Sequence, residues 1–151
     1  MKKVIAVCGA FDPLHSGHLE HIRLAKKLGD YLIVILNSDE DVVRKRGINF
    51  MPIGQRYQIL KALKDVDEVV IGIDNDGTVA NTLLMIKPDI LAKGGDRVSS
   101  TMPQKEIEAC QKIGCQIVYG IGEALASSTA LLKRVREFKG ELEHHPSGDF
   151  K

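Results

Sequence analysis

The chain has 151 residues, a formal net charge of +1 and 44% hydrophobic residues. This length suits one folded domain with a substantial buried core. The small net charge gives no overall field that would attract nucleic acid or a membrane surface, so we expect neither as a partner. No apolar run reaches the roughly 20 residues of a membrane-spanning helix, and the short apolar run at the start does not resemble a signal peptide, so we expect a cytoplasmic protein.

Cysteines and acidic residues give no sign of a metal site. Cys8, Cys110 and Cys115 form no paired Cys-x-x-Cys motif. An odd number of thiols without metal-ligand spacing fits a reducing cytoplasm, where cysteines remain as free structural side chains. Aspartates and glutamates are scattered along the chain, so we expect no two-metal carboxylate site.

Segments with the apolar spacing of strands and of helices alternate along the chain. Strands are predicted over residues 4–8, 31–36, 68–73, 89–92 and 116–119. Helices are predicted over residues 18–28, 55–63, 78–86, 103–113 and 128–138. This alternation predicts a single Rossmann-like, doubly wound α/β domain over residues 1–139, with a five-stranded parallel sheet flanked by helices. Residues 140–151 have little apolar content and are expected to form a flexible tail.

The run Gly-Ala-Phe-Asp-Pro-Leu-His-Ser-Gly-His at residues 9–18 joins the first strand to the first helix. Free backbone N–H groups and the positive end of the helix dipole meet at such a junction and attract anions. Gly17 has no Cβ to keep a phosphate from the backbone, and His15 and His18 can donate to the same phosphate oxygens. The alternative is that both histidines are surface residues of an ordinary loop.

The spacing Gly-x-Phe-Asp-x-x-His-x-Gly-His resembles the signature of the cytidylyltransferase-like nucleotidyltransferases, and the resemblance extends through most of the chain. It implies that a phosphate monoester attacks the α-phosphorus of a nucleoside triphosphate and that pyrophosphate leaves. It also implies that Mg²⁺ is bound mainly through the nucleotide phosphates, and that His15 and His18 stabilise charge without acting as nucleophiles. The nucleotide-binding loop around them would comprise Gly9, Ala10, Phe11, Asp12 and Gly17.

A basic run, Arg44-Lys45-Arg46 followed by Gly47, comes after the second strand. Such a run is usually a solvated surface, but here we expect it on a loop beside the phosphate site, where it holds the β- and γ-phosphates. Related enzymes place a lysine before the glycine. Arg46 stands there in this chain and is assigned a catalytic role, with Lys45 beside it as a nucleotide ligand, so which side chain contacts phosphate is open.

Two later segments also resemble binding elements of the family. Arg56 is predicted near the start of a helix, where the resemblance implies contact with the acceptor phosphate; the alternative is an exposed helix arginine. Lys93-Gly94-Gly95-Asp96 resembles the turn that binds the nucleoside. Paired glycines let the backbone approach the ribose and base, and a carboxylate accepts a hydrogen bond from a sugar hydroxyl. A plain turn is the alternative.

Ser127, Ser128 and Thr129 precede the last predicted helix, where they fit either a helix N-cap or a cap that is also a second phosphate cradle. This segment and the Lys-Gly-Gly-Asp turn look most like adenylyltransferases that activate heptose 1-phosphate. Cytidylyltransferases for glycerol 3-phosphate carry an arginine before the last helix, and this chain lacks it. The resemblance therefore favours ATP as donor and a sugar phosphate as acceptor.

Other functions stay open at this point. CTP-dependent transfer to an alditol or alcohol phosphate is one, and FAD synthesis is another, because archaeal FAD synthetases share the first motif. A non-catalytic nucleotide-binding module is a third, although the combination of His15, His18, Arg56 and Ser128 argues against it. No P-loop or Rossmann Gly-x-Gly-x-x-Gly is present, which disfavours kinases and dehydrogenases. The family commonly forms dimers, so we expect that a homodimer can form.

Overall fold

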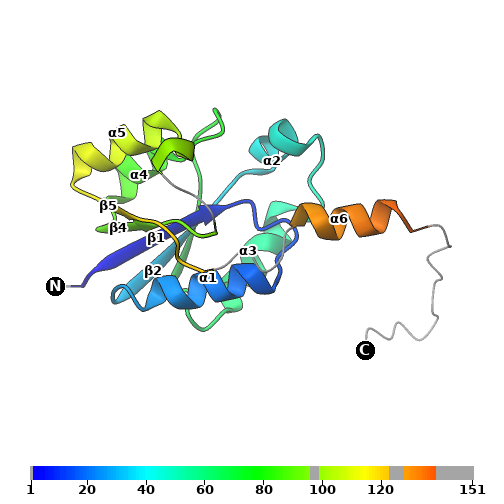
Figure 1. Ribbon diagram of the computed structural model, residues 1–151, viewed down its shortest axis with the longest axis horizontal. Coiled ribbons are helices and arrows are strands. Elements are labelled where there is room, and N and C mark those ends of the chain that lie inside the picture. The colour runs from blue at the N-terminus through cyan, green and yellow to red at the C-terminus, as the bar shows by residue number, and fades with distance from the viewer. Residues whose placement is uncertain (1, 96–98, 123–127, 139–151) are drawn as a thin grey trace.

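The structure is a computed structural model of the chain, and it describes residues 2–95, 99–122 and 128–138. It confirms the predicted fold, a five-stranded parallel sheet with helices on both faces (Figure 1). The strands are β1 (Val4–Gly9), β2 (Tyr31–Leu36), β3 (Glu68–Ile71), β4 (Ile90–Ala92) and β5 (Gln116–Val118). The predicted tail, Asp96 and Ser127 lie outside the described residues.

Six α-helices connect or follow the strands within the described part of the chain. They are α1 (Ser16–Lys26), α2 (Asp39–Arg46), α3 (Ile53–Ala62), α4 (Ala80–Ile86), α5 (Gln104–Ile113) and α6 (Ser128–Arg136), and Ser99–Thr101 forms a short 3-10 helix. Across the described ranges, none of these helices has the length and apolar character that a membrane span requires. The predicted helices match α1 and α3 to α6 to within two residues at each end, whereas α2 was not predicted.

The sheet order is β3-β2-β1-β4-β5, and every neighbouring pair is parallel. The chain runs outward from β1 to β3 and then returns past β1 to form β4 and β5. The direction of winding thus reverses between β1 and β4, and sheets of this kind bind ligands at the carboxyl ends of such strands. Because His15 and His18 follow β1 and Lys93 follows β4, the topology brings the motif and the predicted nucleoside turn to the same crevice.

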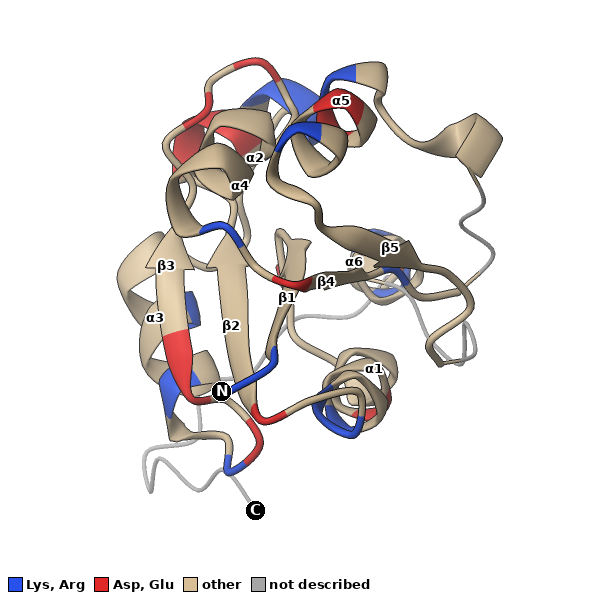
Figure 2. Cartoon of the chain, turned by 90° about the vertical axis from the view of Figure 1, so that its left-hand side faces the viewer, with Lys and Arg blue, Asp and Glu red and all other residues tan. Residues whose placement is uncertain are grey.

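Successive side chains of β1 point into two separate cores. Ile5 and Val7 pack with residues of α1 and α3, while Ala6 packs with residues of α4 and α5. Figure 2 shows these two pairs of helices on opposite faces of the sheet. Strand β2, which lies between β3 and β1, is buried from its second residue to its last, as a parallel strand covered on both faces should be.

The basic residues 44–46 form the last turn of α2, so our expectation that they lie on a loop is wrong. Val42 is the single buried apolar residue of this helix, and one such residue gives no helical periodicity to detect. Local polar groups stabilise the helix instead. Ser38 Oγ accepts the N–H of Asp41 at 3.2 Å, acidic residues occupy the first turn and basic residues the last, and Gly47 ends the helix with a φ of 83°.

Gly29, in the turn between α1 and β2, has no room for a side chain. A Cβ atom there would lie 2.7 Å from the backbone oxygen of Lys3 and still closer to Ile5 Cδ1. We expect Gly29→Ala to lower the free energy of unfolding by about 1–3 kcal/mol, the usual cost of overpacking. Gly54→Ala in α3 is the control, because its Cβ would meet open space. Urea denaturation measures both, and an unchanged midpoint for Gly29→Ala would contradict this packing.

Candidate active site

His15 and His18 cap helix α1 through a reciprocal pair of hydrogen bonds. His15 Nδ1 accepts the backbone N–H of His18 at 3.3 Å, and His18 Nδ1 accepts the backbone N–H of His15 at 3.2 Å. This arrangement is a capping box built from two histidines, and it starts the helix at Ser16, two residues before the predicted start. The two rings stack with their centroids 3.7 Å apart and their planes 16° apart.

The capping bonds determine where each imidazole carries its proton. A ring nitrogen that accepts a hydrogen bond has no proton, so the proton of each neutral ring is on Nε2. Burial is the main cause that lowers the pKa of His18 to about 3, and three nearby basic groups add to it. Burial and Arg46 likewise lower the pKa of His15. At pH 7 the motif therefore presents two neutral Nε2–H donors, neither of them hydrogen-bonded to a described residue, at a helix N-terminus that attracts phosphate.

Phe11 shapes the loop that leads into these histidines. Its backbone has a φ of 51°, in the left-handed region, and its buried ring meets the His18 ring edge-on with 4.9 Å between centroids. A side chain on Gly9 would come within 3.3 Å of the Phe11 ring. Glycine at the end of β1 thus lets the aromatic ring pack beneath the motif, where it helps to fix the His18 ring.

Asp12 is fully buried and ties the motif to the segment between α2 and α3. Its carboxylate accepts the backbone N–H of Phe50 at 2.7 Å and that of Met51 at 2.5 Å. Its own backbone oxygen accepts a hydrogen bond from Arg46 of α2. The carboxylate therefore positions the loop. The nucleotide contact that we predicted for Asp12 stays a prediction.

Arg56 lies in α3 as predicted, but it is only 1% exposed, so the alternative of an exposed helix arginine is wrong. Its Nε and Nη1 donate to the backbone oxygens of Met51, Ala10 and Asn37, each at 2.8 Å. Its Nη2 pairs with Asp39 Oδ1 at 2.6 Å. Four of the five guanidinium N–H groups are thus used within the protein, and the side chain is fully buried.

The three basic residues of α2 lie in different surroundings. Arg44 pairs with Asp41 at 2.9 Å and also donates to the backbone oxygen of Asn75. Arg46 donates to the motif loop, as described above. Lys45 is exposed, has no hydrogen bond to a described residue, and lines a small cavity together with Gly9. Of the three, Lys45 is the side chain whose charged group the fold leaves available.

His21, which we did not predict as a site residue, supports the predicted nucleoside turn. Its Nδ1 lies 2.5 Å from the backbone oxygen of Ile121, and burial lowers its pKa, which makes the neutral ring the donor. A Cβ on Gly94 would lie 2.7 Å from the same Nδ1, so only glycine fits against this ring. The sequence could have indicated that His21 belongs to the site, because it is three residues after His18 and therefore on the same side of α1.

Lys93 is buried at the end of β4, between side chains from β1 and α5. Its Nζ lies 3.1 Å from Cys8 Sγ and 3.3 Å from Glu106 Oε1. Burial acts to lower the pKa of Lys93, but Cys8 and Glu106 outweigh it, so the pKa is raised and the ammonium stays charged. Sequence reasoning missed Glu106, because a glutamate in an amphipathic helix gives no local sign that it is buried.

Helix α6 is docked directly on the histidine motif. Ser128, which is buried, donates from its Oγ to the backbone oxygen of Pro13 at 2.7 Å. Thr129 is exposed and, with Arg46 and Phe50, lines a cavity of about 450 Å³ between α6 and the loop that precedes α3. The start of the last helix therefore lies beside the histidine loop, although Ser128 itself is committed to holding the two together.

Comparison with known protein families gives a single clear assignment. Residues 6–134 match the family model described as cytidylyltransferase-like. The chain belongs to the cytidylyltransferase-like family. Membership confirms the resemblance drawn from the motif, and it confirms the predicted class of enzyme, a nucleotidyltransferase.

Individual relatives carry different names. An FAD synthase from Pyrococcus abyssi is 36% identical over 142 residues, which are 88% of this chain and 92% of that protein. The bifunctional protein HldE from Hahella chejuensis is 36% identical over 148 residues, 90% of this chain but only 28% of that protein. The crystal structure of a lipopolysaccharide core biosynthesis protein from Thermoplasma volcanium has 28% identity and a TM-score of 0.67, and the match covers 82% of this chain and 98% of that one.

The buried position of Arg56 generates a stability prediction. We expect Arg56→Ala to lower the free energy of unfolding by about 3 kcal/mol, because it leaves a carboxylate and three backbone oxygens without their donor. Arg56→Lys should restore only part of this loss, since lysine lacks the planar fork of donors. Lys61→Ala on the exposed side of α3 is the control. Equal urea midpoints for Arg56→Ala and the control would overturn the structural role.

The neutral histidines make stability depend on pH. An unfolded histidine takes up a proton near pH 6.5, whereas the pKa of His18 is about 3 in the folded chain. Between these values the unfolded state binds more protons, so stability is lost as the pH falls through this window. We expect His18 to contribute a loss of about 2 kcal/mol between about pH 6.5 and 4, a value reduced for the partial exposure of the ring.

His18→Gln isolates this contribution from that of the carboxylates. Glutamine has no titrating ring, and its side-chain oxygen can still accept the N–H of His15. The free energy of unfolding of the variant should therefore fall less steeply as the pH is lowered. Urea titrations at matched pH values measure both proteins, and parallel pH profiles would show that the folded His18 ring is not held neutral.

Proposed function

We propose that this protein transfers the AMP portion of ATP to a phosphate monoester. An acceptor phosphate oxygen attacks the α-phosphorus of ATP, and the bond from that phosphorus to the oxygen that bridges to the β-phosphate breaks. The bridging oxygen leaves with its electron pair as part of pyrophosphate. The observation that carries this proposal is the stacked, mutually capped pair of His15 and His18, which presents two neutral N–H donors at the N-terminus of α1.

The two histidines act by stabilising charge that grows on the transferred phosphate. Preorganised donors are effective in this role because they need no rearrangement as the charge develops. Nδ1 of each ring is occupied by the helix cap, so the reaction uses Nε2–H alone. Lys45 supplies a cation for the β- and γ-phosphates, and Thr129 at the start of α6 supports the nucleotide from the other side of the motif.

Arg56 acts on the acceptor site indirectly, by holding the backbone around it. It holds the backbone of Ala10 and Asn37 at the carboxyl ends of β1 and β2. Within the described residues, no three His, Cys, Asp or Glu side chains gather as a metal-binding group. We expect Mg²⁺ to be bound mainly through the nucleotide phosphates, where the ion would neutralise charge on the leaving pyrophosphate.

Two acceptors follow from the family. A sugar phosphate such as heptose 1-phosphate is the first, because the Lys-Gly-Gly-Asp turn and the serine-threonine start of the last helix resemble those adenylyltransferases. FMN is the second, and the match along 92% of an FAD synthase favours it. FAD is FMN joined to AMP, so both acceptors require ATP as the donor. The lack of the late arginine of CTP-dependent relatives also favours ATP.

Pyrophosphate release tests this function directly. ATP and CTP are compared as donors with heptose 1-phosphate, FMN and glycerol 3-phosphate as acceptors, in the presence of Mg²⁺. We expect release with ATP and one of the first two acceptors. Faster release with CTP and glycerol 3-phosphate would reject the adenylyltransferase assignment, and no release with any pair would favour a non-catalytic nucleotide-binding module.

His18→Ala tests the role of the motif. Removal of one preorganised donor lowers kcat by about 10²–10³, and we expect the KM for ATP to change much less, because the charge appears only in the transition state. The lost cap should reduce stability by about 1 kcal/mol. Arg23→Ala, exposed on the same helix, is the control. Near-normal single-turnover rates for folded His18→Ala would remove the motif from catalysis.

A further inference from the structure

Helix α5 ends in a turn that brings two cysteines together. Gly114 has a φ of 71°, in the left-handed region, and its N–H donates to the backbone oxygen of Gln111 at 3.4 Å. The next N–H along the chain, that of Cys115, donates to the backbone oxygen of Cys110 at 2.9 Å. These two hydrogen bonds define a Schellman motif, in which the side chains at the positions of Cys110 and Cys115 commonly touch.

The hydrogen bond between the two backbones also limits how far apart the cysteines are. A carbonyl oxygen lies about 2.4 Å from the Cα of its residue, and an amide nitrogen lies about 1.5 Å from its own. Because the oxygen of Cys110 and the nitrogen of Cys115 are 2.9 Å apart, the two Cα atoms are separated by less than about 6.8 Å. Disulfides join residues whose Cα atoms are about 4.4–6.8 Å apart, so the backbone places this pair within reach of a disulfide.

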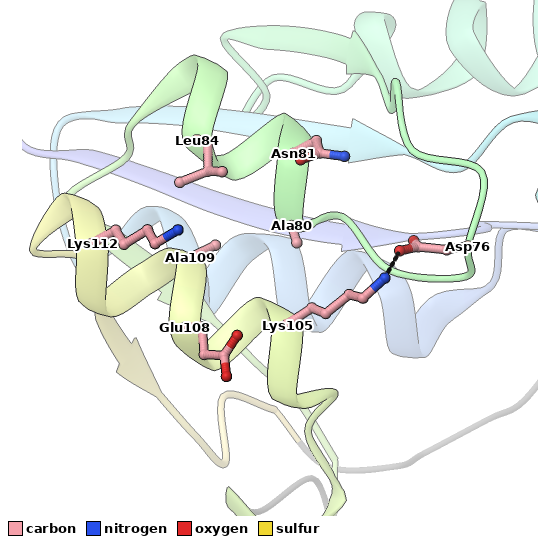
Figure 3. A pocket seen from close by; sticks show the side chains of 8 residues that line it. All are labelled: Asp76, Ala80, Asn81, Leu84, Lys105, Glu108, Ala109 and Lys112. Atoms are coloured by element: carbon pink, nitrogen blue, oxygen red, sulfur yellow. Dashed lines mark hydrogen bonds and ion pairs between the residues drawn. The ribbon is translucent and has the colours of Figure 1, made fainter.

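Both cysteines belong to the apolar core between the sheet and helices α4 and α5. Cys110 is 1% exposed and Cys115 is 8% exposed, and they pack in one cluster with Leu91 of β4. The solvent side of α5 is a different surface, and its charged residues line the pocket between α4 and α5 in Figure 3, namely Lys105, Glu108 and Lys112. Burial restricts the reagents that reach the two thiols to small ones, such as hydrogen peroxide.

The two thiols differ in acidity because they interact with each other. Hydrogen bonding with Cys115 is the main cause that lowers the pKa of the Cys110 thiol, and it outweighs the opposing effect of burial. The same interaction raises the pKa of the Cys115 thiol. A thiol that attacks an oxidant needs thiolate character, whereas its partner keeps its proton until the second step. The pair thus has an attacking thiol, Cys110, and a resolving thiol, Cys115.

We infer that Cys110 and Cys115 are a redox-active dithiol, which hydrogen peroxide converts to a reversible disulfide. The Cys110 thiolate attacks one oxygen of the peroxide, the O–O bond breaks, and hydroxide leaves and takes up the proton that Cys110 released. Cys110 is then a sulfenic acid. The Cys115 sulfur attacks the Cys110 sulfur, the S–O bond breaks, and the hydroxyl leaves as water with the Cys115 proton. The two thiols lose two electrons and two protons in total, and the peroxide becomes two water molecules.

The disulfide protects this core from irreversible damage. A sulfenic acid without a partner thiol is oxidised further to sulfinic and sulfonic acids, which thiol reductants do not reverse. Either acid would place a negative charge in the apolar core that contains Leu91, at a high cost in free energy. Cys115 intercepts the sulfenic acid before this happens. The inference is independent of the proposed function, since it requires neither a nucleotide nor an acceptor.

Peroxide treatment of the unaltered, folded protein tests the inference. After excess peroxide is removed, thiols are counted in denaturant, and we expect the three free cysteines to fall to one. Dithiothreitol should restore all three. Trypsin cleaves after Lys112, between the two cysteines, so mass spectrometry should find two peptides that are joined by a disulfide and separate on reduction. Three thiols that remain countable, or a disulfide that includes Cys8, would overturn the inference.

Two matched variants assign the roles within the pair. Cys115→Ser removes the resolving thiol, so peroxide should leave a Cys110 sulfenic acid that dimedone traps, and longer treatment should cause a loss of thiol that dithiothreitol does not restore. Cys8→Ser is the control and should lose both of its remaining thiols reversibly, without dimedone label. Equal dimedone labelling of the unaltered protein and Cys115→Ser would show that Cys115 does not resolve the sulfenic acid. If Cys115→Ser does not fold, the peptide map of the unaltered protein and the thiol count of Cys8→Ser decide.

Discussion

The buried guanidinium of Arg56 is the interaction on which the site depends. It joins the backbone at the ends of β1 and β2 to α2 and α3 through four hydrogen bonds, one of them to the Asp39 carboxylate. Asp12 adds a second link, from the motif to the loop before α3. A charge buried this deeply is stable only when its donors are matched, so these segments must come together in one arrangement. The histidine motif is fixed to that frame.

Electrostatics in the motif favour neutral donors over cations. His15 and His18 use their Nδ1 atoms to cap α1, and burial beside other basic groups keeps both rings uncharged. Positive charge comes instead from Lys45, Arg46 and Lys93 around them, and from the helix dipole. This combination of neutral imidazoles and surrounding cations suits the proposed nucleotidyl transfer between two polyanions. The cations attract the phosphates, while the imidazoles supply directed hydrogen bonds at the reacting group.

The small cavity lined by Gly9, Asn37, Lys93 and Glu106 differs from the histidine motif in the polar groups that it presents. It contains the ion pair of Lys93 with Glu106 and the buried Asn37 Oδ1, which has no hydrogen bond to a described residue, whereas the motif side presents donors. The strand order β3-β2-β1-β4-β5 places the two surfaces on either side of the same strand end.

The sequence by itself determined the parallel α/β fold, the strand positions and the histidine motif at the start of α1, because apolar periodicity and helix capping act over a few residues. It did not indicate α2, whose single buried apolar side chain leaves no pattern. Only the tertiary structure decided that Arg56 is buried and that Lys93 meets Cys8 and Glu106. Those contacts join residues 46 and 85 positions apart, as from Arg56 to Ala10 and from Lys93 to Cys8. The burial of a charged side chain depends on such distant partners, which local sequence patterns do not predict.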